Sequence, residues 1–242
     1  MSTLLEAEAL SVGYKVQEPI LSQINFRLKV GSFVGLFGAN GTGKSTLLRT
    51  LGGFLPVLSG KLQLEQKKLK DYSNQEKARK IALVFTERIQ PPYLTVYEAI
   101  KMGRMPYTSW THSLSLADEK AIQKAIERCN VAHLTHKELA NLSDGEYQKV
   151  MIARALAQDC PLMLLDEPTA FLDIQHKKNV FKLLANIVKE TPTAVVLSTH
   201  DLTFCMNYCN QAWLIDAQKK FITYESVHSE LIDELLQQIC PD

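Results

Sequence analysis

The chain has 242 residues, of which 46% are hydrophobic and 22% are charged, and its formal net charge at pH 7 is +1. This length can bury a sizeable core, as one large domain or as one domain with a sub-domain. The near-zero net charge does not indicate binding to a nucleic acid or to an anionic membrane surface.

Three further features of the sequence concern its compartment. The longest apolar runs, such as Ala194–Leu197, are far too short to cross a bilayer. The N-terminus has no basic region followed by an apolar stretch, so no signal peptide is expected. The five cysteines are scattered along the chain, which argues against a disulfide framework and suits a reducing compartment. We therefore expect a cytoplasmic protein.

The first part of the chain is expected to form strands. Apolar or alternating runs cover Leu4–Val12, Ile24–Val30 and Phe33–Phe37, and glycine or proline separates them. The next clear strand is Ile81–Phe85, which is followed by a proline-containing loop from Thr86 to Leu94.

The middle of the chain is mostly helical in pattern. The pattern runs from Thr95 to Ala140, with one loop around Met105–Ser115. Ala117–Cys129 carries apolar residues on one side and charged residues around the other, which is typical of an amphipathic helix. The result is an α/β core with a helical insertion.

The last third of the chain returns to an alternation of strand and helix. Leu162–Leu165 and Ala194–Ser198 are buried-type strands joined by a helix at Gln175–Lys189, a βαβ unit that implies a parallel sheet. The remaining predicted elements are a hairpin made by Ala212–Asp216 and Lys220–Tyr224, and a closing helix at Glu230–Ile239.

The most specific motif follows the strand that ends at Phe37. The segment Gly38-Ala39-Asn40-Gly41-Thr42-Gly43-Lys44-Ser45-Thr46 fits G-x-x-x-x-G-K-[ST], the phosphate-binding P-loop. Backbone N–H groups and the helix dipole then favour an anion, Lys44 reaches the β- and γ-phosphates, and the Ser45 hydroxyl can ligate Mg²⁺. A glycine-rich turn that binds nothing is disfavoured, because a strand and a helix flank the loop.

Two acidic residues follow the buried strand Leu162–Leu165. The carboxyl end of such a strand is where α/β sheets place ligand chemistry. Asp166 can hold Mg²⁺ through its water shell, and Glu167 can face the γ-phosphate and polarise a water for in-line attack. Taken alone, this pair could equally be the start of a loop. On the same chain as a P-loop it indicates a nucleotide site.

His200 follows the strand Ala194–Ser198 and so opens onto the same edge of the predicted sheet. There it can donate a hydrogen bond to a γ-phosphate oxygen. A structural or merely exposed histidine is the alternative. The other histidines are left unassigned: His112, His133, His136, His176 and His228.

With these motifs in this order, nearly the whole chain resembles the ATP-binding subunits of ABC transporters. The segments that match the nucleotide motifs of the family are Gly38–Thr46 for Walker A, Leu162–Glu167 for Walker B, Ala170–Asp173 for the D-loop and His200 for the switch histidine. Leu142–Glu146 matches the signature motif and comes before a predicted helix at Tyr147–Gln158. Tyr14 matches the aromatic residue that stacks on adenine. As a lone tyrosine after a strand, Tyr14 would more often be a packing residue.

The resemblance implies a fold, cofactors and catalytic roles. The fold would be a P-loop NTPase core with an N-terminal antiparallel β sub-domain and an inserted α-helical sub-domain. The chain would be one domain, with core and β sub-domain in 1–85 and 160–242 and the helical sub-domain in about 86–159. ATP and Mg²⁺ would be the cofactors, with Ser45 and Asp166 as metal ligands and Glu167 and His200 as catalytic residues. Asp173 would be the D-loop residue.

The signature segment departs from the family form LSGGQ. Asp144 replaces a glycine and Glu146 replaces the glutamine, whereas Ser143 and Gly145 are kept. Ser143 with Glu146 also fits a helix-capping box, the plain structural interpretation. In the family this helix N-terminus binds the ATP held by the other subunit. We expect the site to work, with ATP-driven dimerisation weakened by the added negative charge.

A second departure lies after Phe85, where the family normally has the Q-loop glutamine that contacts Mg²⁺ and faces the membrane partner. This chain has Thr86-Glu87 instead, with Gln90 nearby. Our hypothesis is that Thr86 or Glu87 takes the role of that glutamine.

The segments Leu94–Val96 and Gly103–Tyr107 resemble a stretch found in importers for iron–siderophore complexes, haem and cobalamin. A helix end and loop is the plain interpretation. Such a loop could dock a coupling helix of a membrane partner.

The resemblance therefore implies a homodimeric ATPase at the cytoplasmic face of the membrane. It would power import, through a separate permease, of an iron chelate (siderophore or haem) or cobalamin supplied by an extracytoplasmic binding protein. One alternative is an ABC ATPase without a transport role, such as an iron–sulfur assembly component. Another is a regulatory module that binds ATP without turning it over, against which Glu167 and His200 argue.

Overall fold

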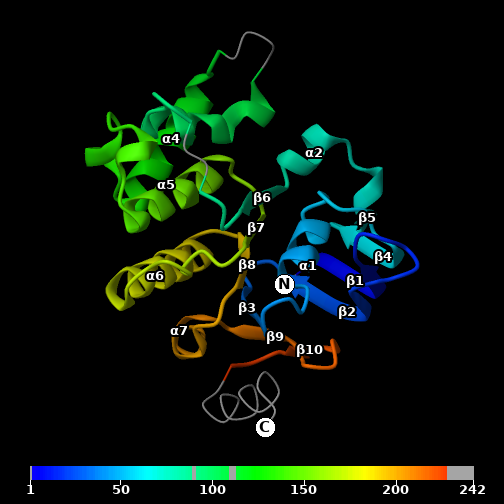
Figure 1. Ribbon diagram of the computed structural model, residues 1–242. Helices are drawn as coiled ribbons and strands as arrows, with labels where there is room; N and C mark the ends of the chain where they lie inside the picture. Colours follow the sequence, from blue (N-terminus) through cyan, green and yellow to red (C-terminus); the bar gives the residue numbers. More distant parts are fainter. Residues whose placement is uncertain (1, 89–90, 109–112, 228–242) are drawn as a thin grey trace.

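Two β-sheets organise the computed structural model, which describes residues 2–88, 91–108 and 113–227 (Figure 1). The four-stranded sheet has the order β2-β1-β4-β5, and its strand pairs are antiparallel. The predicted strands at Leu4–Val12 and Ile24–Val30 correspond to β1 (Thr3–Val12) and β2 (Leu21–Lys29). The patterns do not predict β4 (Ser59–Leu64) or β5 (Lys67–Lys68), because these strands are largely polar and exposed.

The six-stranded sheet has the order β10-β9-β3-β8-β7-β6. Its strands are β3 (Phe33–Gly38), β6 (Ile81–Val84), β7 (Leu162–Leu165), β8 (Ala194–Ser198), β9 (Gln211–Ile215) and β10 (Phe221–Tyr224). All neighbouring pairs are parallel except β9 and β10, which pair antiparallel. The predicted βαβ unit and the predicted hairpin are therefore both confirmed.

Alternate residues of the parallel strands enter two separate cores. On β3, Val34 and Leu36 pack with helix α1 (Lys44–Leu51) and the antiparallel sheet. Phe33 and Phe37 pack on the opposite face, in the core that includes α6 (Ile174–Glu190). Because both faces are covered, the parallel strands are apolar throughout, as expected for buried parallel sheets.

The helical part of the chain lies beyond β6 and β7, away from the antiparallel sheet (Figure 1). It contains α3 (Val96–Lys101), η2 (Met102–Tyr107), α4 (Leu116–Cys129), η3 (Ala132–Leu134), η4 (Leu139–Asn141) and α5 (Asp144–Ala157). The amphipathic helix predicted at Ala117–Cys129 is α4. The predicted loop around Met105–Ser115 is wrong at its start, since η2 continues to Tyr107.

The helix predicted at Tyr147–Gln158 begins earlier than expected, at Asp144. The cause is a capping box at Ser143, whose hydroxyl accepts from the Glu146 N–H while the Glu146 carboxylate accepts from the Ser143 N–H. The signature residues Asp144, Gly145 and Glu146 thus form the first turn of α5.

Three short helices outside this region are absent from the predicted elements: η1 (Leu69–Asp71), α2 (Asn74–Ala78) and α7 (Leu202–Tyr208). The closing helix predicted at Glu230–Ile239 lies outside the described residues. Within the described ranges, no helix has the length and apolar character needed to cross a membrane.

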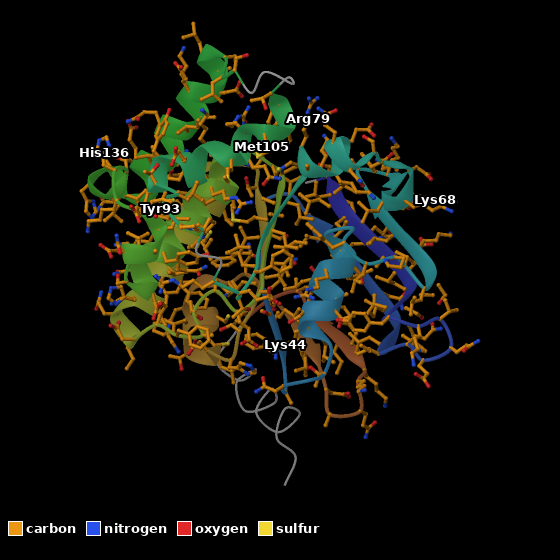
Figure 2. All side chains as sticks on the ribbon, turned by 45° about the horizontal axis from the view of Figure 1, so that its top comes forward. Lys44, Lys68, Arg79, Tyr93, Met105 and His136 are labelled. Atoms are coloured by element: carbon orange, nitrogen blue, oxygen red, sulfur yellow. The ribbon has the colours of Figure 1, made fainter. Side chains whose placement is uncertain are left out.

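The Gly103–Tyr107 segment holds the helices together. Arg104 is buried, and its guanidinium bonds the Asp118 carboxylate at 2.8 Å and the Ala157 carbonyl of α5 at 2.8 Å. The Pro106 carbonyl accepts from Arg79 at 2.9 Å, beside α2, which joins this segment to the other side of the molecule. Figure 2 shows Met105 close to Arg79 at this junction.

Candidate functional site

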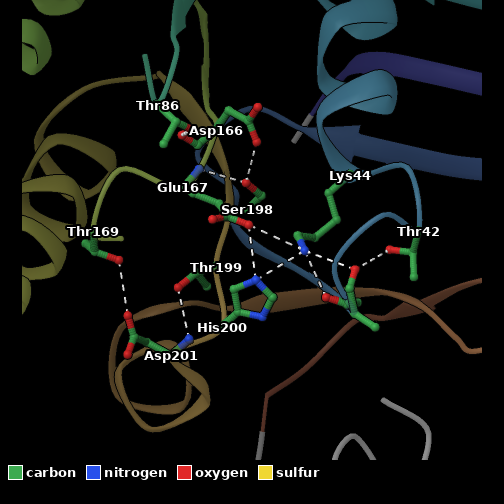
Figure 3. Close-up of polar contacts among 12 residues, drawn as sticks. Thr42, Lys44, Thr86, Asp166, Glu167, Thr169, Ser198, Thr199, His200 and Asp201 are labelled. Carbon is green, nitrogen blue, oxygen red and sulfur yellow. Dashed lines mark hydrogen bonds and ion pairs between the residues drawn. The ribbon is translucent and has the colours of Figure 1, made fainter. Parts of the chain in front are cut away.

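Four parallel strands deliver the predicted functional residues to one edge of the six-stranded sheet (Figure 3). The P-loop follows β3, Thr86 follows β6, Asp166 and Glu167 follow β7, and His200 follows β8. The carboxyl ends of parallel strands are where such sheets bind ligands. The structure therefore brings the candidate nucleotide-binding and catalytic residues together.

The P-loop turns sharply into α1. Gly43 stands at the N-cap with φ of +111°, a conformation that side-chain-bearing residues rarely adopt. The Lys44 side chain is buried and folds back over the loop, where its Nζ donates to the Gly38 carbonyl at 2.9 Å and to the Ala39 carbonyl at 3.3 Å. The Thr42 hydroxyl donates to the same Ala39 carbonyl at 2.9 Å, so the loop is internally braced.

A cavity of about 380 Å³ opens beside this loop. It is lined by Ile20, Asn40, Gly41, Gly43, Lys44, Ser45, Thr46, Thr86 and Glu167. Ile20 belongs to no sequence motif; its side chain lies against Gly43, where an added Cβ would come within 2.8 Å of it. The walls are backbone amides, one ammonium and several oxygens, which is the lining that a polyphosphate needs.

Lys44, Glu167 and His200 form one polar cluster at the cavity. The Glu167 Oε1 lies 3.5 Å from the Lys44 Nζ and 3.1 Å from the His200 Nε2. The His200 Nε2 in turn lies 3.3 Å from the Lys44 Nζ. A carboxylate here can orient an attacking water, while the ammonium and the imidazole can stabilise charge on a transferring phosphoryl group.

Ser198, at the end of β8, sets the positions of both acids, a role that no sequence pattern indicated. Its buried hydroxyl donates to the Asp166 Oδ1 at 2.8 Å and accepts from the Glu167 N–H at 2.8 Å. Glu167 has φ of +46°, which is uncommon for a residue with a side chain.

The oxygen donors near the P-loop suit a hard cation such as Mg²⁺. Ser45, Thr86 and Glu167 line the cavity, and the neighbouring Asp166 is buried. In the part of the chain that the structure describes, no group of three or more His, Cys, Asp or Glu residues could hold a metal. Mg²⁺ at nucleotide sites is bound through one or two protein oxygens together with phosphates and waters. When bound, it would neutralise developing phosphate charge.

The signature turn and the D-loop meet through a histidine that the sequence left unassigned. Asp173 caps α6 by accepting from the His176 N–H at 2.8 Å, and its other oxygen lies 2.8 Å from the His176 Nδ1. These contacts lower the pKa of Asp173. The imidazole rests on Gly145, where a Cβ would lie 2.5 Å from the His176 Cδ2. A side chain at position 145 would therefore require the His176 ring to move.

Comparison with known proteins agrees with this arrangement. Residues 21–170, more than half of the chain, match the family model for the ABC transporter ATP-binding domain. This chain belongs to the ABC transporter ATP-binding family. It is 32% identical to the ferric enterobactin transport ATP-binding protein FepC of Escherichia coli, over 97% of this chain and 86% of FepC. Membership of this family means that the chain binds and hydrolyses ATP.

Solved ABC cassettes share the fold. A chain from an inward-facing ABC transporter assigned to the metal-chelate type superposes with a TM-score of 0.82 at 29% identity, covering 98% of this chain and 90% of that one. The dimeric cassette MJ0796 superposes with a TM-score of 0.74 at 25% identity, covering 87% of this chain and 94% of that one. The predicted P-loop NTPase fold of an ABC ATPase is thus confirmed.

Within this ABC ATPase, the two residues at the Q-loop position behave differently. Thr86 lines the P-loop cavity, and its hydroxyl donates to the Asp166 carbonyl at 2.7 Å. Glu87 instead points away to Arg49 of α1, with 3.5 Å between the Arg49 Nη2 and the Glu87 Oε1. Thr86 therefore has the better placement for the role of the missing glutamine, which stays a prediction.

Tyr14 and the signature residues lie outside the P-loop cavity. Tyr14 is 64% exposed, in the segment between β1 and β2, so its stacking on adenine stays a prediction. Ser143 is engaged in its capping box, in which the Ser143 N–H and hydroxyl bond the Glu146 carboxylate and lower its pKa. Binding of phosphate at this turn also stays a prediction.

Proposed function

We propose that this ABC ATPase powers the uptake of an iron chelate through a separate membrane permease. The observation that carries the proposal is an apolar cleft of about 740 Å³ between the helical region and the rest of the molecule. It is lined in part by Phe54, Leu83, Met102 and Met105. Phe54 is 64% exposed and Met105 is 54% exposed, an arrangement that suits docking of an amphipathic helix.

The cleft adjoins the nucleotide site, which supports coupling between the two. Phe85 and Glu87 line the cleft, while Thr86 between them lines the P-loop cavity. A partner helix seated in the cleft would therefore press on the segment that contacts the Asp166 carbonyl. The iron chelate is favoured as substrate because FepC, a relative along almost the whole chain, is a ferric enterobactin transport protein. The iron chelate would be a siderophore complex or haem, and cobalamin is the other candidate substrate.

We further propose that two copies close around ATP, with Ser143 and Gly145 of each facing the P-loop of the other. Phe171 and Ile174 flank the D-loop Asp173 and are 76% and 78% exposed, so a second copy could cover them. The dimeric cassette MJ0796 supports this arrangement. In this view residues 86–159 form the helical sub-domain, and residues 1–85 and 160–242 form the core with the β sub-domain. The protein would sit at the cytoplasmic face of the membrane, bound to its permease.

The cleft is tested with the full chain co-expressed with its permease. Met105→Glu places a charge in the cleft and should abolish co-purification and chelate uptake while ATP hydrolysis by the isolated chain persists. Leu116→Glu is the matched control, because Leu116 is 77% exposed on the helical region but does not line the cleft. Retained uptake by Met105→Glu cells would refute docking in the cleft. An ATPase without any polytopic partner would favour a non-transport role.

A further inference from the structure

We propose that Arg88 is a positioning residue for the signature turn. Its guanidinium neutralises Asp144 and ties the start of α5 to the segment that follows β6. The inference rests on the proposed function, since it assumes that the phosphates of a second copy's ATP approach this turn.

Arg88 contacts the signature region at several points. Its Nη1 lies 2.5 Å from the Asp144 Oδ1, and its Nη2 donates to the Leu142 carbonyl at 2.6 Å. The guanidinium carbon also lies 4.9 Å from the centre of the Tyr147 ring. One side chain thus contacts Leu142 before the N-cap, Asp144 at the start of α5 and Tyr147 one turn further along. Such a fork fixes orientation as well as charge.

Arg88 belongs to a short segment whose neighbouring residues contact other parts of the site. The Thr86 hydroxyl bonds the carbonyl of Asp166, and Glu87 pairs with Arg49 on the helix that begins with Lys44. Consecutive residues therefore contact the acidic strand end, the P-loop helix and the signature turn. Any displacement of this segment moves Arg88 and, through it, the start of α5.

The signature turn carries two acids that face an incoming phosphate, and each has a cationic partner. The Glu146 carboxylate accepts a hydrogen bond from the Ser143 hydroxyl, and its Oε1 lies 3.7 Å from the Lys137 Nζ. Asp144 is paired with Arg88. An unpaired carboxylate at a helix N-terminus would occupy the positive end of the dipole and repel a second anion. The two cations offset this charge, so phosphate binding at the backbone N–H groups is retained.

The decisive experiment compares Arg88→Ala in two backgrounds. ATP-dependent dimerisation is measured by sedimentation in Mg²⁺ at low ionic strength, in full-length Glu167→Gln protein so that the dimer persists. The dimer contains two signature turns, so Arg88→Ala should weaken dimerisation roughly fivefold for each unmasked surface charge, or about 25-fold in all. In the Asp144→Asn background, where no charge needs masking, the same change should alter dimerisation less than twofold.

Further measurements separate charge masking from a structural role. Arg88→Lys keeps the charge and should recover at least half of the loss, and high salt should reduce the loss by screening. Binding of a fluorescent ATP analogue to the monomer should not change, because Arg88 is not among the residues lining the P-loop cavity. Arg128→Ala is the control, since Arg128–Glu190 is a pair of similar exposure, at 23% and 54% against 29% and 56%, away from the site.

The outcomes are distinguishable. An equal loss from Arg88→Ala in both backgrounds, or no loss in either, would overturn the inference and leave the proposed function intact. A Glu167→Gln parent that hydrolyses no ATP, binds the analogue and never dimerises would overturn the two-copy proposal and the role of Arg88 with it.

Discussion

The Lys44 ammonium and the Glu167 carboxylate lie 3.5 Å apart, Nζ to Oε1, although they come from different strand ends of the sheet. The side chain of Lys44 is 5% exposed and that of Glu167 is 26% exposed. The Lys44 ammonium thus lies beside the Glu167 carboxylate, which also contacts His200. Phosphate oxygens of ATP would compete with this acid for the ammonium, which would release Glu167 toward a water.

Lys44→Ala should weaken ATP binding at least tenfold, because a charge-assisted bond to phosphate contributes about 1.5 to 3 kcal/mol. The affinity of a fluorescent ATP analogue measures the change. Lys61→Ala is the control, since Lys61 pairs with Glu8 on the antiparallel sheet, away from the cavity. Unchanged affinity in Lys44→Ala would contradict the assignment of this cavity to nucleotide.

Thr86→Val should lower ATP hydrolysis roughly tenfold, with ATP affinity changed less. Valine has the shape of threonine but leaves the Asp166 carbonyl without its hydroxyl donor, at a cost of about 1 to 3 kcal/mol for a buried acceptor. Glu87→Ala is the matched comparison. Its partner is Arg49, so we expect hydrolysis by the isolated chain to persist. If the Glu87 variant loses hydrolysis and the Thr86 variant keeps it, the roles are reversed.

Asp118→Asn should reduce the free energy of unfolding by about 2 to 4 kcal/mol, because it leaves the buried Arg104 guanidinium without its counter-charge. Urea unfolding measures this loss. Glu119→Gln, on the same helix turn but exposed, should change stability little. A loss below about 0.5 kcal/mol would show that the pair does not anchor the helices.

The Asp118 pair also predicts an acid dependence of stability. Burial opposes ionisation of Asp118, but hydrogen bonds from Ser115 and the Arg104 guanidinium outweigh it and hold the Asp118 pKa below its usual range. The unfolded chain therefore binds a proton at higher pH than the folded chain. The stabilisation is complete above the ordinary aspartate pKa of about 3.9 and is lost as pH falls toward the lower folded value. Asp118→Asn should flatten this dependence.

Gly145→Ala should destabilise the fold by about 0.5 to 1 kcal/mol, because its methyl group forces the His176 ring away from Asp173, and this loss exceeds the gain in helix propensity from alanine. Thermal unfolding measures the change. The double variant Gly145→Ala, His176→Ala should recover more than half of it. Failure of the second substitution to restore stability would mean that the ring is not the obstacle.

The residues that carry phosphate chemistry could be predicted from sequence because each belongs to a local pattern. The P-loop is a contiguous strand, loop and helix, and its geometry follows from its own glycines. Asp166, Glu167 and His200 come directly after buried strands. The parallel pairing of those strands brings their carboxyl ends to one edge whatever the rest of the chain does. Strand β7 and strand β8 have the predicted bounds for the same reason.

The contacts that tune the site were decided by the tertiary structure alone. Ser198 bridges Asp166 and Glu167 across 32 and 31 positions of sequence, and Arg88 reaches Asp144 across 56. A single serine or surface arginine produces no periodic signal, so the sequence carried no trace of either role. Ser198 meets the two acids only after β7 pairs with β8, and Arg88 meets Asp144 only after α5 packs beside the segment that follows β6. The sequence thus determined which phosphate chemistry is present, and three-dimensional packing decided which side chains hold and neutralise it.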